Sequence, residues 1–444
     1  MDVSSSLQAA RSVPTPWGSS DELRARRLRP GPAASREASK VNQRERLYAA
    51  MVACAATRGY RATSVADLVS LAGVSRATYY TLFRDRADCF QQTIEVVLKG
   101  GLELLQSRIE RSWGNPEAGA RAALEDLLRL IEKQPAAAYM SLVEAYASGR
   151  TGAEPVQNAF EQACEITHRV LQDLPDRENT PAPIARAIVG GVHRIVYRHL
   201  DGGEADQLPA ARDPLWSWAR ELTLPERLQT RRKVRPLEAR PLAPTAHDSY
   251  ENLIRSFAFV VADRGFSRLR VSDVAAQARI SNATFYRHFR NKYDAFIAAL
   301  DLSGAQIVAA SLPAARRAGS WQAAVIRALE GVCDFLAAEP AFAHLRAVEV
   351  YTVGPEAIAH RDRAWGQILE EFVPDEVRRT RATALKLEAS SGAIFALIYE
   401  KVRRGEMQDL RELPPLLSYI ILAPLVGKEQ ARTVLAQTQQ RGAR

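Results

Sequence analysis

One stretch of this chain occurs twice. Residues 73–90 read GVSRATYYTLFRDRADCF and residues 279–296 read RISNATFYRHFRNKYDAF, with small or apolar residues at nearly every corresponding position. The likeness continues further along, because EAYASG at 144–149 corresponds to EVYTVG at 349–354. A repeat that spans most of a long chain indicates two copies of one domain, and it excludes a single large fold.

The apolar residues of both copies follow a helical period. In the first expected helix of each copy they recur at i, i+4 and i+7, which is typical of one buried face. These residues are Leu47, Met51 and Cys54 in the first copy, and Leu253, Phe257 and Val260 in the second. No convincing strand alternation occurs. The sequence therefore predicts an all-α protein made of two tandem units, without a sheet.

A short helix, a tight turn and a second short helix follow in each copy. In the first copy Ser64 and Asp67 are spaced as a capping box, and the helix they begin ends near Gly73. Ser75 can then cap a helix that runs to Phe83. Two short helices joined by a turn that contains glycine are typical of a helix-turn-helix.

These residues resemble the tetracycline-repressor (TetR) family of transcriptional regulators. The resemblance is carried by TSVADLVSLAGVSRATYYTLFRDRADCF at 63–90 and LRVSDVAAQARISNATFYRHFRNKYDAF at 269–296. It implies an N-terminal three-helix unit that reads double-stranded DNA, and a helical body that dimerises and binds a small-molecule effector. It also implies a bacterial, cytoplasmic, nucleoid-associated repressor that needs no cofactor.

The resemblance and the helix geometry together select the candidate DNA contacts. For phosphate contacts these are the hydroxyls at the start of the second short helix, the tyrosines and the next cations: Ser75, Thr78, Tyr80, Arg86, Ser281, Thr284, Tyr286 and Lys292. For base contacts they are the residues that differ between the copies: Arg76, Tyr79, Thr81, Asn282, Phe285 and Arg287. His288 is a further candidate DNA contact, because it matches the family pattern. The alternative for the serines is helix capping, and for the tyrosines it is core packing.

Three departures from the family pattern separate the copies. Arg270 replaces the capping hydroxyl of Ser64, which should cost about 1 kcal/mol. Leu82 stands where the family has His or Tyr, so we expect the first copy to hold DNA less firmly. Arg279 replaces the turn glycine, and it either adopts an unusual backbone angle or faces a phosphate.

Composition adds weak support for a polyanionic partner and no support for catalysis. The net charge is +9 and the isoelectric point is near 9.5. The four cysteines are not spaced as metal ligands, and no H-E-x-x-H or phosphate-binding glycine motif occurs. No membrane partner is expected, because no run approaches the roughly 18 consecutive apolar residues of a span. We predict that the protein is not an enzyme.

Composition and the repeat also divide the chain. The tail contains Arg24, Arg26, Arg27 and Arg29, and it is expected either to be solvated or to touch phosphates. The expected parts are a disordered basic tail (1–40), a first helix-turn-helix domain (41–90) and its body (91–225), a proline-rich linker (226–246), and a second helix-turn-helix domain (247–296) with its body (297–440).

Two copies in one chain can pair with each other. TetR-family members bind DNA as homodimers, so the sequence favours an intrachain pseudo-dimer that reads an operator with two different half-sites. A homodimer of two chains is the main alternative. A third interpretation is a helical ligand sensor or scaffold in which one DNA-binding copy is degenerate.

Overall fold

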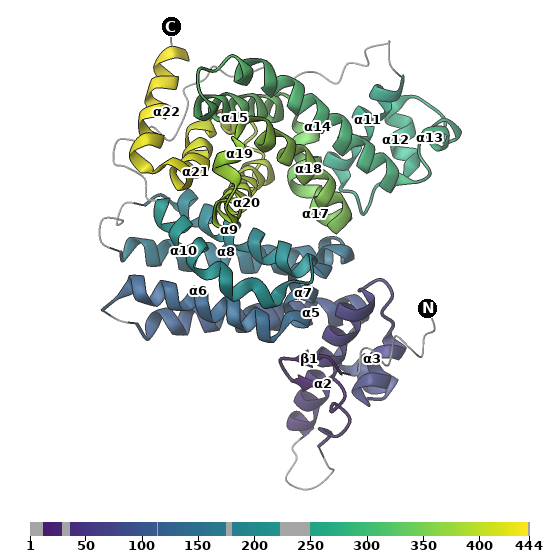
Figure 1. The fold of residues 1–444 in the computed structure, drawn as a ribbon. Coiled ribbons are helices and arrows are strands. Elements are labelled where there is room, and N and C mark those ends of the chain that lie inside the picture. The colour runs from purple at the N-terminus through teal and green to yellow at the C-terminus, as the bar shows by residue number, and fades with distance from the viewer. Residues whose placement is uncertain (1–11, 29–35, 113, 175–179, 223–248, 443–444) are drawn as a thin grey trace. The chain divides into compact units, whose positions relative to one another are not determined.

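The computed structural model describes residues 12–28, 36–112, 114–174, 180–222 and 249–442. Helices account for most of these residues (Figure 1), which confirms the all-α class. One small sheet was not predicted: the antiparallel pair β1 (Pro14–Thr15) and β2 (Gly18–Ser19). The expected linker at 226–246 lies outside the described residues.

The first copy consists of three helices, which form the expected DNA-binding unit, followed by a longer body. The DNA-binding unit contains α2 (Arg36–Arg58), α3 (Val65–Ala72) and α4 (Arg76–Leu82). The remaining elements are α5 (Arg86–Glu110), α6 (Pro116–Lys133), α7 (Pro135–Leu142), η2 (Glu144–Ser148), α8 (Arg150–Gln172), α9 (Ala182–Asp201), η3 (Ala205–Ala211) and α10 (Arg212–Glu221).

The second copy repeats this order. Its DNA-binding unit contains α11 (Ser249–Arg264), α12 (Val271–Ala278) and α13 (Asn282–His288). The remaining elements are α14 (Lys292–Arg316), α15 (Trp321–Ala338), α16 (Pro340–His344), η4 (Leu345–Glu349), α17 (Val350–Val353), α18 (Pro355–Phe372), α19 (Asp375–Arg378), α20 (Arg381–Arg403), η5 (Gln408–Glu412), α21 (Pro414–Val426) and α22 (Lys428–Gly442).

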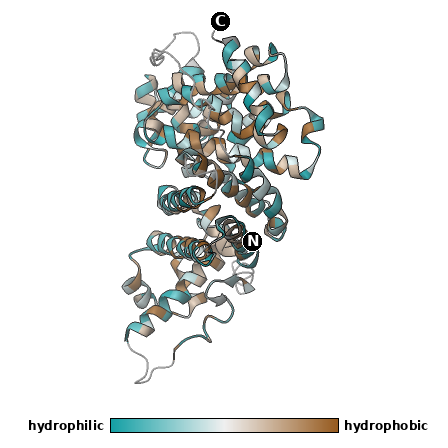
Figure 2. Cartoon of the chain, turned by 90° about the vertical axis from the view of Figure 1, so that its left-hand side faces the viewer, coloured by the Kyte–Doolittle hydropathy of each residue, from teal (hydrophilic) through white to brown (hydrophobic). Residues whose placement is uncertain are grey.

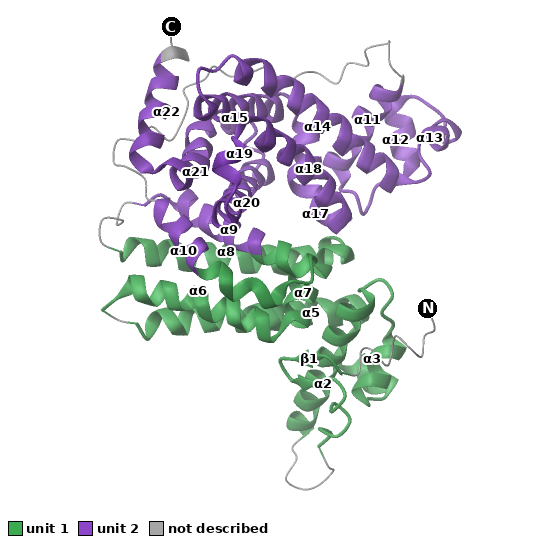
Figure 3. Cartoon of the chain, in the orientation of Figure 1, with its two compact units in different colours: residues 1–175, 196–212 green, residues 176–195, 213–444 purple. Residues whose placement is uncertain are grey.

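The chain divides into two compact units that do not coincide with the two copies (Figure 3). Unit 1 covers residues 1–175 and 196–212, and unit 2 covers 176–195 and 213–444. The first part of α9 and nearly all of α10 therefore belong to the compact unit that contains the second copy. The boundary between the two compact units therefore does not lie at the linker alone.

The helix α14 is a long apolar helix at the start of the second body. By length and composition it could cross a membrane, and 44% of its most apolar window is buried. It packs against α15, α18 and α11, with Phe296, Leu300 and Ile307 in the core. Hydrophobic positions lie mostly inside this body in Figure 2. Packing on three neighbouring helices accounts for the apolar composition of α14.

Residues 12–28 are folded, which corrects the prediction that the whole segment 1–40 is disordered. Leu23 is 1% exposed, and the ring of Trp17 lies 5.3 Å from that of Tyr48 on α2. The backbone N–H of Val13 donates to Ser20 Oγ at 2.9 Å. A few apolar side chains with no period among them attach this segment to the first DNA-binding unit, so hydrophobic periodicity did not reveal it.

Candidate nucleic-acid interface

The first short helix of the first copy is fixed at both ends by the residues that the sequence indicated. Ser64 Oγ accepts from the N–H of Asp67 at 3.2 Å, and the N–H of Ser64 donates to Asp67 Oδ2 at 2.9 Å. Gly73 ends the helix at φ 61°, in the left-handed region. The predicted capping box and C-cap of α3 are confirmed.

The second short helix of each copy, here called the reading helix (α4 or α13), begins at a capping serine. Ser75 Oγ accepts from the N–H of Thr78 at 3.0 Å, and Ser281 Oγ accepts from the N–H of Thr284 at 3.1 Å. The capping alternative for the serines therefore holds. Both serines are also exposed, so the start of each reading helix can still accept a phosphate.

The two candidate phosphate-binding tyrosines lie at the surface in the same way. Tyr80 and Tyr286 are each 55% exposed, which is unusual for a large aromatic side chain. The ring of Tyr80 meets that of Tyr79 edge-on, and Tyr286 meets Phe285 likewise, at an interplanar angle of 87° in both cases. Their positions leave both phenol groups available to an external partner.

Tyr79 and Phe285 belong to the core, which corrects their selection as base contacts. Both are 0% exposed. The hydroxyl of Tyr79 donates to the backbone oxygen of Asp85 at 3.1 Å, and burial raises the pKa of this phenol. The substitution of Phe for Tyr between the copies is thus a difference in core packing, and neither ring can reach a base.

The remaining candidate base contacts and His288 are exposed on the reading helices. Arg76 and Thr81 lie on α4, whereas Asn282, Arg287 and His288 lie on α13. The two helices therefore present different hydrogen-bonding groups, with a guanidinium in the first turn of α4 and in the last turn of α13. Leu82, which corresponds to His288, is 9% exposed and packs in the core.

Arg86 and Lys292 have partners inside their own domains. Arg86 Nη1 donates to the backbone oxygen of Thr63, and its guanidinium lies 4.4 Å from the ring centre of Tyr60. Lys292 Nζ donates to Phe266 O at 2.9 Å, and partial burial lowers its pKa. Both residues were selected as candidate phosphate contacts, but their hydrogen bonds to these carbonyl groups explain their positions without an external anion. Arg86 and Lys292 thus make the same kind of contact in the two copies.

The left-handed turn of the second copy is occupied by Arg279. Its φ is 57°, and it is the one residue other than glycine with positive φ among the described residues. The expectation of an unusual backbone angle is confirmed, because the corresponding Gly73 has nearly the same φ. Most residues with a Cβ avoid this region.

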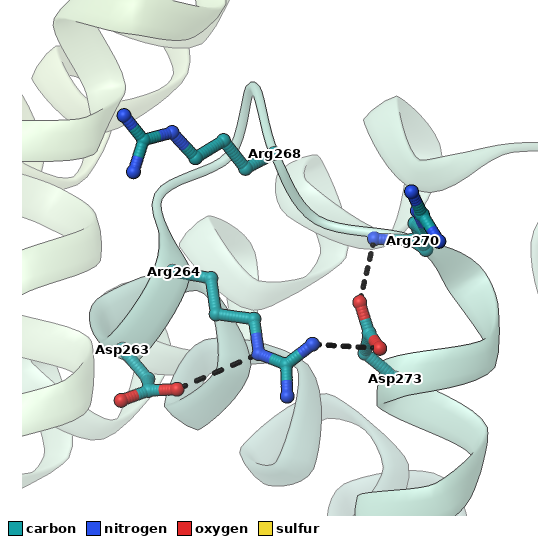
Figure 4. A pocket seen from close by; sticks show the side chains of 5 residues that line it. All are labelled: Asp263, Arg264, Arg268, Arg270 and Asp273. Atoms are coloured by element: carbon teal, nitrogen blue, oxygen red, sulfur yellow. Dashed lines mark hydrogen bonds and ion pairs between the residues drawn. The ribbon is translucent and has the colours of Figure 1, made fainter.

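A polar hollow lies beside the start of α12 (Figure 4). It is lined by Asp263, Arg264, Arg268, Arg270 and Asp273. Arg264 Nη1 contacts Asp273 Oδ1 at 2.7 Å, and the N–H of Arg270 donates to Asp273 Oδ2 at 3.2 Å. The side chain of Arg270 makes no capping bond, as its replacement of serine predicted. This leaves basic side chains around the N-terminus of α12.

A contact between body and DNA-binding unit was missed at the sequence level. The N–H of Tyr60, directly after α2 and Gly59, donates to Glu144 Oε1 at 2.5 Å. In the second copy the N–H of Phe266 donates to Glu349 Oε2 at 2.8 Å. The repeated Glu of EAYASG and EVYTVG was the available signal. Both carboxylates are buried, and a buried charge needs a partner.

Within unit 2, α9 and α20 pack with their backbones in close contact. A Cβ added to Gly190 would lie 2.8 Å from the oxygen of Gly392, and one added to Gly392 would lie 2.5 Å from the oxygen of Gly190. Only glycine allows this approach. Trp218 of α10 fills the adjacent space and donates from Nε1 to Ser390 Oγ at 3.0 Å.

Charged side chains surround this glycine contact. Arg194 Nε lies 2.6 Å from Glu388 Oε1, and the same guanidinium contacts Asp362. Arg361 also binds Asp362, at 2.8 Å. Because of the two guanidinium groups and despite burial, the pKa of Asp362 stays below its usual range. Arg186 and Glu400 form a further pair.

Two helix-turn-helix units, each followed by a helical body, define a tandem DNA-binding regulator. The family model described as bacterial regulatory proteins, tetR family, matches residues 47–93 and 259–299, one match in each copy. Both copies therefore contain the DNA-binding region that this family model describes.

Solved structures of two regulators named FadR are also similar to this chain. One is transcriptional regulator FadR from Bacillus subtilis in complex with stearoyl-CoA, with 19% identity and a TM-score of 0.33. The other is fatty acid degradation regulator FadR from Bacillus halodurans, with 19% identity and a TM-score of 0.35. Each match covers 40% of this chain and 98% of the other. No curated protein sequence matches the chain.

Proposed function

We propose that this chain is a transcriptional repressor that binds one double-stranded DNA operator with both of its helix-turn-helix domains. The two copies pair within the chain as a pseudo-dimer, and the operator has two different half-sites. A small-molecule effector bound in the helical bodies releases the DNA. This last part rests on the two matches to the tetR family model alone.

The contact between Gly190 and Gly392 carries the proposal of a pseudo-dimer. In the aligned segments GGVHRIVYRHL and GAIFALIYEKV these two glycines are counterparts. A residue that meets its own counterpart lies near a two-fold axis, because a two-fold interface places the same patch on both sides. The contact of α9 with α20 is the one expected when two copies of a dimerising domain pair with each other.

The charges around this contact favour pairing between unlike copies. By the same alignment Arg186 corresponds to Glu388, and Arg198 corresponds to Glu400. The observed pair is Arg186 with Glu400. If two first copies paired in the same way, Arg186 would face Arg198, and in two second copies Glu388 would face Glu400. Like charges would then disfavour both symmetric pairings.

The exposed residues of the reading helices support an asymmetric operator. Arg76 and Arg287 can each form a bidentate pair with guanine, and Asn282 can pair with adenine. These residues lie at different positions of α4 and α13. Since α4 keeps an exposed Arg76 and an exposed Tyr80, we favour DNA reading by both copies over the alternative in which one copy is degenerate.

A gel-shift experiment with genomic fragments tests the proposed function. The full chain is mixed with fragmented genomic DNA at increasing salt, and retained fragments are sequenced. We expect a small set of fragments to remain bound at salt concentrations that release the bulk, because specific complexes outlast the electrostatic background. Release of all fragments at the same salt concentration would contradict a role as a specific regulator.

A further inference from the structure

The turn before each reading helix has an arginine beside it, but the two arginines come from different parts of the chain. In the second copy Arg279 is itself the turn residue. In the first copy the turn residue is Gly73, and Arg24 from the N-terminal segment covers it. A Cβ added to Gly73 would meet Arg24 Cγ at 2.9 Å. The stem of Arg24 thus lies where a side chain of residue 73 would begin.

Arg24 is held at this place while its guanidinium stays exposed. Its Nε donates to the backbone oxygen of Ser70 at 3.1 Å, and its Nη2 donates to the same oxygen at 2.5 Å. A guanidinium has five N–H donors, so several remain for another partner. The buried side chain of Leu23 attaches the segment one residue earlier.

The side chain of Arg279, in the second copy, contributes little to holding the fold together. Arg279 is exposed, and its guanidinium takes part in none of the hydrogen bonds or ion pairs formed within the described part of the chain. A residue with a Cβ in the left-handed region is strained, and strain of this kind is concentrated at functional sites. An exposed cation kept in a strained turn beside a DNA-reading helix points to an external anion.

We propose that Arg24 and Arg279 are equivalent phosphate-binding residues, each of which contacts the DNA backbone beside its own reading helix. The inference rests on the proposed DNA-binding function. Phosphate contacts fix the position of a reading helix and carry little sequence information. Both copies therefore use the same phosphate contact although their base-reading residues differ, and the first copy obtains it from the N-terminal segment.

The salt dependence of DNA binding tests this inference. The full chain is titrated against a fluorescein-labelled duplex of mixed sequence, and anisotropy gives the binding constant over a salt series. Each phosphate contact contributes about 0.9 to the slope of log K against log salt. Arg24→Ala and Arg279→Ala should each reduce that slope by about 0.9. Arg379→Ala is the control, because Arg379 is exposed beside α19 of the second body, and it should leave the slope unchanged.

Three further variants separate phosphate binding from a structural role. Arg24→Gln can still donate to Ser70 O but carries no charge, so its slope should fall as in Arg24→Ala, whereas Arg24→Lys should keep the wild-type slope. Adding Gly73→Arg to Arg24→Ala should restore the slope, because it copies the arrangement at Arg279. Circular dichroism confirms that each variant is folded.

The outcomes separate the two proposals. If the wild-type chain fails to bind the duplex at low salt, the proposed function is wrong and this inference falls with it. If the wild-type chain binds, and the arginine variants keep its slope or lose no more than Arg379→Ala does, DNA binding stands and only the equivalence of Arg24 and Arg279 is overturned.

Discussion

Glu144 accepts a hydrogen bond from the backbone N–H of Tyr60, at 2.5 Å, and so joins the first body to its DNA-binding unit. Glu349 does the same for Phe266 in the second copy, at 2.8 Å. Each carboxylate lies next to the glycine that follows the first helix of its DNA-binding unit. Glu144 lies next to Gly59, and Glu349 lies next to Gly265. A movement of the body that displaced either carboxylate would act directly on the DNA-binding unit.

Removing the acceptor should therefore destabilise the first copy. Glu144→Ala leaves the N–H of Tyr60 without its acceptor in a site where Tyr60 is only 8% exposed, at a cost of about 1 to 3 kcal/mol. Glu144→Gln keeps an oxygen that can accept, so it should lose clearly less. Urea unfolding followed by circular dichroism measures both. Equal losses for Ala and Gln would show that this hydrogen bond is not what Glu144 contributes.

Acid should destabilise the folded chain through His193 of α9. Burial, and then the charge of Arg194, lower the pKa of His193 from 6.5 to about 4. The folded state resists protonation more than the unfolded state does. Stability from neutral His193 is thus fully present above pH 6.5 and is lost as the pH falls from 6.5 to about 4, by at most about 3 kcal/mol.

Unfolding midpoints measured between pH 7 and pH 4 check this dependence on His193. His193→Gln cannot be protonated in that range, so the stability of this variant should fall less steeply with acid than that of the wild type. His199→Gln, on the same helix, is the matched control and should follow the wild-type curve. A steep wild-type curve that His193→Gln leaves unchanged would assign the acid sensitivity to other groups.

The ion pairs around the glycine contact should be coupled. Arg194→Met leaves Glu388 and Asp362 without this cation, and breaking a buried pair costs about 3 to 5 kcal/mol. We expect the lower end, because Arg361 still binds Asp362. Glu388→Gln should cost less, and the double variant should lose less than the sum, with a coupling of about 1 to 3 kcal/mol. Strict additivity in urea unfolding would contradict a direct interaction.

The tyrosines of the two reading helices should act on all DNA sequences alike. Tyr80→Phe and Tyr286→Phe each remove an exposed hydroxyl that we propose to bond a phosphate. Affinity for specific and for random duplexes should fall by the same factor, since backbone contacts carry little sequence information. Competition titrations with both duplexes measure the ratio. A changed ratio would indicate that the tyrosine reads bases.

Much of the fold could be predicted from the sequence, because local signals and the repeat agree. Capping residues such as Ser64 and Ser75, the turn at Gly73 and the helical period are short-range features. Duplication repeats the helical period and the cap at Ser75, the latter as Ser281, and so provides a second observation of both. For Arg279 the sequence left open an unusual backbone angle or a phosphate contact, and its φ of 57° confirms the unusual angle.

The errors arose where tertiary contacts decide the role of a residue. A seven-residue helix such as α4 is too short for periodicity to separate its buried face from its exposed face, so Tyr79 was assigned to bases although it is 0% exposed. The carbonyl partners of Arg86 and Lys292 come from residues more than twenty positions earlier. The attachment of residues 12–28 depends on Trp17 and Leu23 alone among large apolar groups, which is too few for a pattern.

The central claim is that each copy reads its own half of one operator. Selection of binding sites from a random duplex library, with the wild-type chain and with Arg76→Ala and Arg287→Ala, tests it most directly. The account predicts a wild-type site with two unlike halves about one helical turn apart. Arg76→Ala should relax specificity in one half and Arg287→Ala in the other, each by about 1 to 3 kcal/mol. A perfect palindrome for the wild type, or the loss of the same half in both variants, would contradict it.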